Sequence, residues 1–494
     1  MPYILALDQG THASRAVLYD LSGAPVAQAA RPLASSYPRP GYVEQDAEEI
    51  FQSQLDAARA VLAKTQLPAS EIVAIGIANQ RETTIVWDAR SGSARAPAIV
   101  WQCRRSAEIC EELRHDGIED ALRERTGLLL DPYFSATKLA WLLRHDAALR
   151  EDAAAGHLRF GTVDSWLLYR LSGRMVHATD PSNASRTLLM DLAQGRFARD
   201  LADLFSLPVS MLPEIRPSVG AFGTVDPSLL GAPIPVTAML GDQQAALFGQ
   251  RCFRPGDVKT TYGTGAFLLA QTGRQAVRSR TGLLTTVAWD LGDGPFYALE
   301  GSVFLAGGIL EWLQAEVGLV ASAAEAEELA RAVPDAGGAL LVPAHAGLGA
   351  PHWDPGARGA ILGLTHGTTK AHLARAAFDA IAYRTDDVLS AMAQDLGGLQ
   401  DLRIDGGVAQ SDLLAQLQAD LSGCAVVRPL DVETTARGAA LAAGLGAGLF
   451  ESLEAIAHLP VPERRFTPHL SVAARSGLRA RWREAIAAVR LLHS

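Results

Sequence analysis

Cysteine and long apolar runs are scarce in this chain of 494 residues. The four cysteines, at positions 103, 110, 252 and 424, form no C-x-x-C pair and do not make a disulfide framework in so long a chain. We therefore expect a reducing, cytoplasmic setting. The apolar run at 4–7 is short and is followed by Asp8, so we expect no secretory leader there. The longest uncharged, apolar-rich stretch, 438–450, is shorter than the ~18 residues that a membrane span needs. We expect no membrane insertion.

Positive charge is also in deficit, because 44 Lys and Arg residues face 54 Asp and Glu residues for a formal net charge of -10. This balance argues against nucleic acid or an anionic membrane surface as the main partner. It permits a phosphorylated ligand, which backbone amides can bind on an acidic protein. With 48% hydrophobic and 20% charged residues, the composition is that of a globular protein, and the length predicts two domains.

Two common phosphate-binding motifs are absent: neither G-x-x-x-x-G-K-[ST] nor the kinase G-x-G-x-x-G loop occurs. Phosphate binding would have to come from two predicted β-hairpins. The first joins strands at 4–7 and 16–19 through Gly10-Thr11, and the second joins 259–262 and 266–270 through Gly263-Thr264-Gly265. Each hairpin alone is more often a plain turn. Together they favour phosphate binding and suggest a duplicated architecture with a cleft between the halves.

Strand-like and helix-like runs alternate along the chain, which predicts an α/β protein. We place the domain boundary near 249–255, giving domains at 1–250 and 251–494, because Gly and Pro interrupt the periodic sequence there. In the second half we expect a strand at 402–404, a helix at 411–421, and another helix at 433–443 with small residues on one face.

Three groups of polar residues follow predicted strands and are candidates for chemistry. Asp8 could hold Mg²⁺ through water, or be a turn aspartate bonded to its own backbone. Arg81 and Glu82 lie between two apolar strands, at 72–77 and 85–87, and could recognise hydroxyl groups or form a mutual ion pair. Asp242 follows a strand at 235–240, before a helix expected from Ala245.

Asp242 could accept the proton of an attacking hydroxyl, as a general base does. The competing interpretation is a helix N-cap, which on pattern alone is equally good, although Ala245 leaves no capping box. Trp101, Tyr133 and Phe267 lie beside polar motifs and could grip a short carbon chain. Core packing is the default for any one of these three rings.

With these strings in view, the chain resembles the FGGY carbohydrate kinase family over almost its full length. The strongest strings are Leu7–Thr11, Asn79–Thr84, Trp101–Arg105, Asp131–Ser135, Gly241–Gln250 and Tyr262–Gly265, together with signature-like segments at 133–145 and 359–379. The resemblance implies an actin-like ATPase (ribonuclease H-like) fold, with two domains of related topology around a central cleft. It implies a homo-oligomer, dimer or tetramer, that uses ATP and Mg²⁺.

Within that family, the Arg-Glu pair and the Trp101 string resemble members that phosphorylate glycerol to sn-glycerol 3-phosphate. The resemblance implies that glycerol is bound by Arg81, Glu82, Trp101, Tyr133, Asp242, Gln243 and Phe267, with Asp242 as the base. It implies magnesium at Asp8 and Asp242. It implies nucleotide contacts at Thr11, His12, Ala13, Arg15, Thr264, Gly265, Gly307, Glu311, Gly407 and Ser411.

Four of these positions depart from the family pattern. His12 and Ala13 replace the usual hydroxyl residues after the first threonine, Glu311 stands where glutamine is frequent, and Ser411 stands where asparagine is frequent. Two alternatives remain for the function. One is another sugar kinase of this fold, acting on dihydroxyacetone or a pentulose. The other is a non-metabolic actin-like ATPase or filament protein, which would polymerise with ATP.

Overall fold

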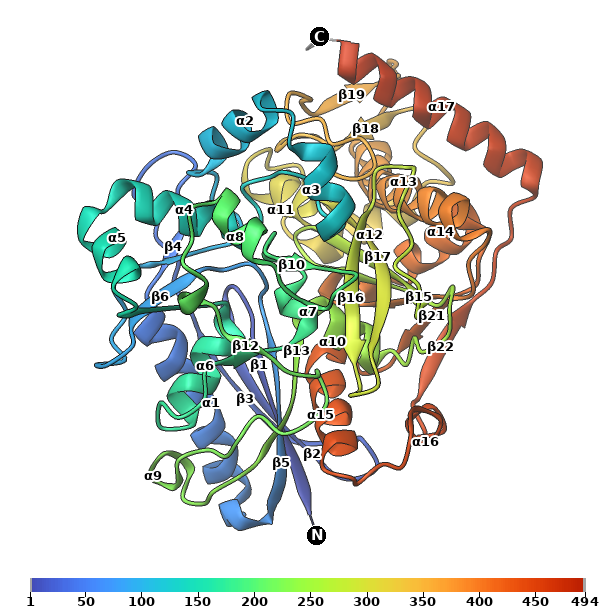
Figure 1. The fold of residues 1–494 in the computed structure, drawn as a ribbon. Coiled ribbons are helices and arrows are strands. Elements are labelled where there is room, and N and C mark those ends of the chain that lie inside the picture. The colour runs from blue at the N-terminus through green and yellow to red at the C-terminus, as the bar shows by residue number, and fades with distance from the viewer. Residues whose placement is uncertain (1, 492–494) are drawn as a thin grey trace.

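The computed structural model describes residues 2–491, and two large β-sheets dominate it (Figure 1). The first sheet has the order β13-β5-β1-β2-β3 and is made from β1 (Tyr3–Gln9), β2 (Ala13–Tyr19), β3 (Pro25–Pro32), β5 (Ile72–Asn79) and β13 (Val236–Gly241). The second has the order β16-β17-β15-β14-β20-β21-β22 and is made from β14 (Val258–Tyr262), β15 (Ala266–Gly273), β16 (Leu284–Asp290), β17 (Pro295–Val303), β20 (Leu402–Asp405), β21 (Val426–Pro429) and β22 (Glu463–Phe466).

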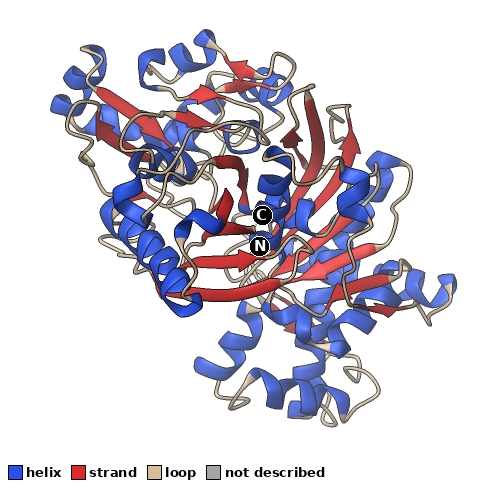
Figure 2. Ribbon diagram, turned by 90° about the horizontal axis from the view of Figure 1, so that it is seen from below, coloured by secondary structure: helices blue, strands red, loops and turns tan. Residues whose placement is uncertain are grey.

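The two sheets repeat one pattern of pairing. In the first, β1, β2 and β3 are successively antiparallel, while β5 and β13 extend the sheet on the other side of β1 in parallel. In the second, β14, β15 and β17 are antiparallel, while β20 and β21 extend it in parallel from β14. This repetition confirms the predicted α/β class and both predicted hairpins. Seen from below, the strands lie inside and helices surround them (Figure 2).

The helices used below follow the apolar patterns of the sequence. They are α1 (Ala47–Thr65), α4 (Ser135–His145), α7 (Pro181–Ala184), α9 (Pro227–Leu230), α10 (Asp242–Gly249), α11 (Gly308–Ala315), α13 (Lys370–Leu396), α14 (Asp412–Ser422), α15 (Thr434–Gly446) and α17 (Val472–Leu491). Helix α1 shows the local logic: the Asp46 carboxylate caps it by accepting from the N–H groups of Glu48 and Glu49, and its apolar stripe is buried against the first sheet. No helix among residues 2–491 has the length and apolar character needed to cross a membrane.

Helix α15 confirms the predicted small-residue face and covers the first sheet. It packs on β1, β5 and β13 of the first sheet and against α10, as its place in Figure 1 shows. The approach is close enough to require glycine, because a Cβ on Gly438 would lie 1.8 Å from the Ala245 carbonyl oxygen. A Cβ on Gly249 would lie 2.1 Å from that of Thr434. Backbones this close leave no space for a methyl group.

Three local predictions need correction. Asp8 is not in a turn: β1 continues through it, and it pairs with Arg15 of β2. Helix α10 begins at Asp242 rather than Ala245, with Gly241 as its N-cap. Ser411 precedes α14 instead of starting it, because its hydroxyl caps the helix by accepting from Leu414 N–H at 3.1 Å.

Candidate active site

The candidate residues of the first half meet at one edge of the first sheet. Gln9, Asn79 and Gly241 end three neighbouring parallel strands and lie in register. The carboxyl ends of parallel strands in open α/β sheets are where ligands bind, because the chain leaves the sheet there as loops and helix starts. Asp8, the segment that follows β5, and Asp242 are therefore neighbours in space.

Arg81 and Glu82 belong to a buried network of four charges. Arg81 donates to both carboxylate oxygens of Glu300 on β17, from Nη1 at 2.7 Å and from Nη2 at 2.8 Å. Arg186 Nε donates to Glu82 Oε1 at 2.6 Å. Arg186 Nη2 lies 3.2 Å from Glu300 Oε1, whereas Arg81 Nε is 3.9 Å from Glu82 Oε1. The expected mutual pair is thus the weakest contact of a network that joins the two halves.

The environment shifts these carboxylates in opposite directions. Burial raises the pKa of Glu300, but Arg186 and Arg81 outweigh it and hold that pKa at about 2. Burial also raises the pKa of Glu82, and there the nearby arginines only partly compensate. The backbone of Glu82 has φ 60°, a conformation that costs free energy for a residue with a side chain. Such strain is typical of sites where a side chain must be held for a ligand.

Asp242 lies at the start of α10 and faces the arginine. Its Oδ1 is 3.2 Å from Arg81 Nε and accepts from Gln243 N–H at 2.7 Å, and 29% of its side chain remains exposed. The N-cap interpretation is wrong, since Gly241 occupies that position and makes no side-chain cap. The Gln243 side chain is held by Lys259 of β14, whose ammonium donates to Gln243 Oε1. Asp242 is thus buried on one side and open on the other, as a proton acceptor needs to be.

The three candidate rings form one wall. Trp101 packs edge-on against Tyr133, with ring centroids 5.7 Å apart, and against Phe267 at 6.1 Å. The indole Nε1–H of Trp101 donates to Thr11 Oγ1 at 3.0 Å, which ties the wall to the first hairpin. Phe267 comes from β15, so this wall also spans both halves.

Asp8 and Arg15 carry the charge of the first hairpin. Burial raises the pKa of Asp8 to about 7, with Asp242 and Glu433 adding to the rise and Arg15 opposing it. Arg15 Nη1 lies 3.8 Å from Asp8 Oδ2 and makes an ion pair with Glu433, the residue before α15. Gly10 N–H donates to Ala13 O at 3.0 Å and closes the turn, leaving His12 exposed.

The predicted nucleotide contacts of the second half come together around glycine backbone. Gly307 N–H donates to Gly263 O at 2.9 Å, so the start of α11 lies against the second hairpin. A Cβ on Gly307 would lie 2.5 Å from a Val408 methyl group, which brings in the turn after β20. Thr264 and Gly407 are exposed beside this junction, as is Glu311 on the first turn of α11. Ser411 lies just beyond Gly407; its hydroxyl oxygen caps α14, and its O–H can still donate to a ligand.

Comparison with known proteins accounts for both halves. The model of the N-terminal domain of the FGGY family of carbohydrate kinases matches residues 3–249, and that of the C-terminal domain matches residues 258–447. The chain belongs to the FGGY family of carbohydrate kinases. The glycerol kinase of Thermus brockianus is 55% identical over 487 residues, covering 98% of each chain.

Solved structures agree with this assignment. The ADP-bound glycerol kinase of Plasmodium falciparum superimposes with a TM-score of 0.93 at 31% identity, covering 99% of this chain and 98% of that one. A ligand-bound xylulose kinase from Lactobacillus acidophilus covers both chains fully with a TM-score of 0.89, and at 21% identity it shows the fold alone. The predicted actin-like ATPase fold of this FGGY family member is confirmed.

Sequence reasoning gave no role to four polar residues that contact the candidate site: Arg186, Gln244, Lys259 and Glu300. Gln244 accepts from Arg81 at 3.3 Å and donates to Val287 O of β16 at 3.2 Å. Lys259 and Glu300 did carry a signal, since each is a charge inside an apolar strand and a buried charge requires a partner. Arg186 lies in a polar loop after α7, where nothing in the sequence marks it.

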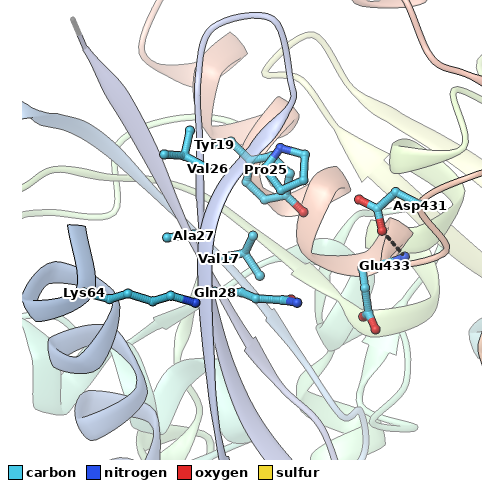
Figure 3. Close-up of a pocket in the computed structure, with 9 residues that line it drawn as sticks. All are labelled: Val17, Tyr19, Pro25, Val26, Ala27, Gln28, Lys64, Asp431 and Glu433. Carbon is cyan, nitrogen blue, oxygen red and sulfur yellow. Dashed lines mark hydrogen bonds between the residues drawn. The ribbon is translucent and has the colours of Figure 1, made fainter.

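A pocket lies along β2 and β3 of this FGGY family member, towards the end of the first sheet opposite to Gln9 (Figure 3). Its volume is about 270 Å³, and it lies between the β2–β3 hairpin and the loop before α15. Glu433 on its rim is the partner of Arg15, and Asp431 accepts from Glu433 N–H at 3.0 Å. No cluster of three or more His, Cys, Asp or Glu residues able to hold a metal ion occurs within residues 2–491.

Proposed function

We propose that this chain transfers the γ-phosphoryl group of ATP to a terminal hydroxyl of glycerol and releases sn-glycerol 3-phosphate. The observation that carries the proposal is the buried Arg81–Glu82 pair, which shares one sheet edge with Asp242. Relatives from 47% to 55% identical over nearly the whole chain are named glycerol kinases, which supports the same substrate.

Glycerol recognition uses charge for the hydroxyls and rings for the carbons. Arg81 donates and Glu82 accepts, and the partners behind them hold both groups still, so little entropy is lost on binding. Tyr133 and Gln243 add polar contacts at the same edge. Trp101 and Phe267 pack against the carbon chain.

Asp242 acts as the general base in an in-line transfer. As the hydroxyl oxygen bonds to the γ-phosphorus and the bond to the β-phosphate oxygen breaks, the hydroxyl proton passes to Asp242 and the electron pair leaves with ADP. Most of the rate enhancement in phosphoryl transfer comes from positioning and charge neutralisation rather than from covalent chemistry. Closure of the two halves would exclude water, so ATP hydrolysis without glycerol should be slow.

The nucleotide binds at the glycine junction of the second half, with Thr264, Gly265, Gly307, Glu311, Gly407 and Ser411 around it and Thr11, His12, Ala13 and Arg15 opposite. Magnesium fits Asp8 and Asp242, because Mg²⁺ takes only one or two carboxylates and keeps several waters. A buried carboxyl group whose pKa is raised by burial and by Asp242 gains from a nearby cation. Bound Mg²⁺ would neutralise charge that builds on the phosphates.

The division into domains at 1–250 and 251–494 is part of the proposal. It is supported by the two repeated sheets and by the ranges 3–249 and 258–447 that the family models match. Helix α15 belongs to the second unit by sequence and covers the first sheet. A cytoplasmic, homo-oligomeric kinase completes the proposal, and light scattering of the purified protein measures the oligomer.

A substrate panel tests this function. ADP release is measured with ATP and Mg²⁺ and with glycerol, dihydroxyacetone, xylulose or gluconate supplied separately. We expect strong turnover with glycerol and a low rate with no acceptor. Preference for one of the other three would overturn the glycerol assignment and leave the family unchanged. ATP-dependent polymerisation without turnover would favour a filament protein instead.

A further inference from the structure

Glu300 lies behind the predicted polyol site, on the far side of Arg81 from Asp242. It is fully buried on β17, and both of its carboxylate oxygens accept from Arg81. The Nη groups of Arg81 are thereby held from the rear, while its Nε lies 3.2 Å from Asp242 Oδ1. A bidentate arginine–carboxylate pair fixes the plane of the guanidinium as well as its position.

Glu82 is held from behind in the same way. Arg186 Nε donates to one oxygen of Glu82 at 2.6 Å, which leaves the other oxygen for a ligand. Arg186 in turn lies 3.2 Å from Glu300, and its guanidinium carbon is 5.5 Å from the centre of the Tyr133 ring. Glu300 therefore contacts Arg81, which is proposed to bind the polyol, and Arg186, which holds Glu82.

The network is balanced in charge. Arg81 and Arg186 contribute two positive charges, and Glu82 and Glu300 contribute two negative charges. Asp242, 3.2 Å from Arg81 Nε, and Lys259, which donates to Gln243, add one charge of each sign, so these six side chains carry no formal net charge. A cluster of this kind suits an uncharged polyol, because an anionic or cationic ligand would meet no excess of the opposite sign there. Glu300 is also the only one of the first four that comes from the second sheet.

We propose that Glu300, together with Arg186, is a positioning residue of the polyol site that sets both the orientation of Arg81 and Glu82 and the preference for an uncharged substrate. The inference rests on the proposed polyol kinase activity. Glu300 acts through Arg81 and Arg186 and does not itself touch the reacting atoms. Because it comes from β17, it makes the geometry of the polyol site depend on how the second half is seated against the first.

The test compares Glu300→Gln with wild type in steady-state kinetics. We expect the KM for glycerol to rise at least about tenfold, because Arg81 and Glu82 would no longer be oriented toward the glycerol hydroxyls. The KM for ATP should stay within about twofold. Glu300→Asp, which keeps the charge but is one methylene shorter, should recover part of the loss. A folded Gln variant with unchanged glycerol KM would overturn the proposal. If the Gln variant does not fold, unchanged glycerol KM in the Asp variant overturns it.

A second readout follows the charge. Glu300→Gln leaves one positive charge in excess, so glycerate, which carries a carboxylate in place of one hydroxymethyl group, should become a better competitor of glycerol. We expect the ratio of glycerate Ki to glycerol KM to fall at least about tenfold relative to wild type. A purely structural role for Glu300 would not lower this ratio. An unchanged ratio would therefore overturn the charge part of the proposal.

Asp386→Asn is the matched control. Asp386 of α13 is also buried and also bidentate with an arginine, accepting from Arg479 of α17 at two distances of 2.7 Å, but this arginine is not part of the network around Arg81. It should lower the melting temperature without changing the glycerol KM. If the wild type phosphorylates a different sugar, the proposed function fails, and the same KM comparison on that sugar still tests Glu300.

Discussion

The two sheets repeat one pattern of strand pairing over five strands, yet their central strands end in different chemistry. In the first sheet, the edge carries charged side chains, namely Asp8, Arg81, Glu82 and Asp242. In the second sheet, the corresponding edge carries glycine: Gly263 and Gly265 follow β14, and Gly406 and Gly407 follow β20. The two sheets thus repeat one framework but present different groups to a ligand: charged side chains at the first and glycine backbone at the second.

The difference follows from the proposed ligands. A small neutral polyol offers only hydroxyl groups, so charged side chains must be held in place to distinguish them, which requires buried partners such as Glu300. Phosphate oxygens carry their own charge and can be bound by backbone N–H groups, which need close approach and no side chain. Substitutions among the polyol side chains of the first edge should therefore affect mainly glycerol, and those at the glycines of the second edge mainly ATP. Asp8, which is proposed to hold magnesium, belongs to the nucleotide side.

The largest expected effect is that of Asp242→Asn, which should lower kcat by at least about 10²-fold because an amide cannot take the hydroxyl proton. Both KM values should rise by a smaller factor, because Asp242 is also proposed to contact glycerol and magnesium. Asp226→Asn serves as the control, since that carboxylate caps α9 by accepting from Ser228 N–H at 2.9 Å. If both variants keep near-normal kcat, Asp242 has only a structural role.

Trp101→Ala should come next, with a roughly tenfold rise in the glycerol KM from the lost packing against the carbon chain. Trp101→Phe keeps a ring but loses the Nε1–H bond to Thr11, and should lie between the Ala variant and wild type. Separate titrations of glycerol and ATP make the comparison. A rise confined to the ATP KM would place Trp101 on the nucleotide side. It would contradict the proposal that this edge of the first sheet binds glycerol.

Gly307→Ala probes the glycine edge in return. Its Cβ would lie 2.6 Å from Gly263 O and 2.5 Å from Val408, so the junction must shift, and we expect an ATP KM roughly fivefold higher with glycerol KM unchanged. Gly477→Ala in α17 is the control, because no atom lies within 4 Å of its new Cβ. Equal changes in both KM values would show that the two edges are not independent.

The smallest expected effect is on the free energy of unfolding. It tests whether a buried group of the first half makes the protein less stable in acid. Burial lowers the pKa of His177 from 6.5 to about 4, and its Nε2 is 2.8 Å from Phe160 O. Below pH 6.5 the unfolded chain binds this proton and the folded chain does not. Stability is therefore full above pH 6.5 and is lost as the pH falls towards 4, by about 2 kcal/mol between pH 6.5 and 5.

His177→Gln should reduce that loss, as measured by chemical denaturation at pH 7, 6 and 5. Asp164 works in the opposite sense, since burial raises its pKa to about 6 and the folded state then gains stability as the pH falls below 6. The difference between wild type and variant isolates His177. Identical pH profiles would contradict the assignment.

The sequence predicted the hairpins and the position of Asp242 after a strand because these depend on local patterns. Turn residues between apolar runs determine them, and the observed registers agree. The start of α10 was placed three residues late, because Asp, Gln and Gln read as a polar loop until Gly241 is recognised as the cap. Family resemblance supplied the roles of Trp101 and Phe267, which the pattern left open.

The partners of Arg81 could not be predicted, because Glu300 lies more than two hundred positions away and on another sheet. The α/β pattern says which strands exist but not which side chains from different sheets meet. Ser411 is a second case: resemblance marks it as a nucleotide contact, and the structure adds that its hydroxyl oxygen also caps α14. Long-range pairing and the second role of a hydroxyl group both require coordinates.

Helix α15 has a consequence for the order in which the protein is made. The last strand of the first sheet ends at Gly241, whereas the helix that covers this sheet begins at Thr434. At 5–20 residues per second, a ribosome needs roughly 10 to 40 seconds to synthesise the intervening chain. During that time the apolar face of β1, β5 and β13 lacks its native cover, so a nascent chain stopped before residue 434 should need protection from aggregation.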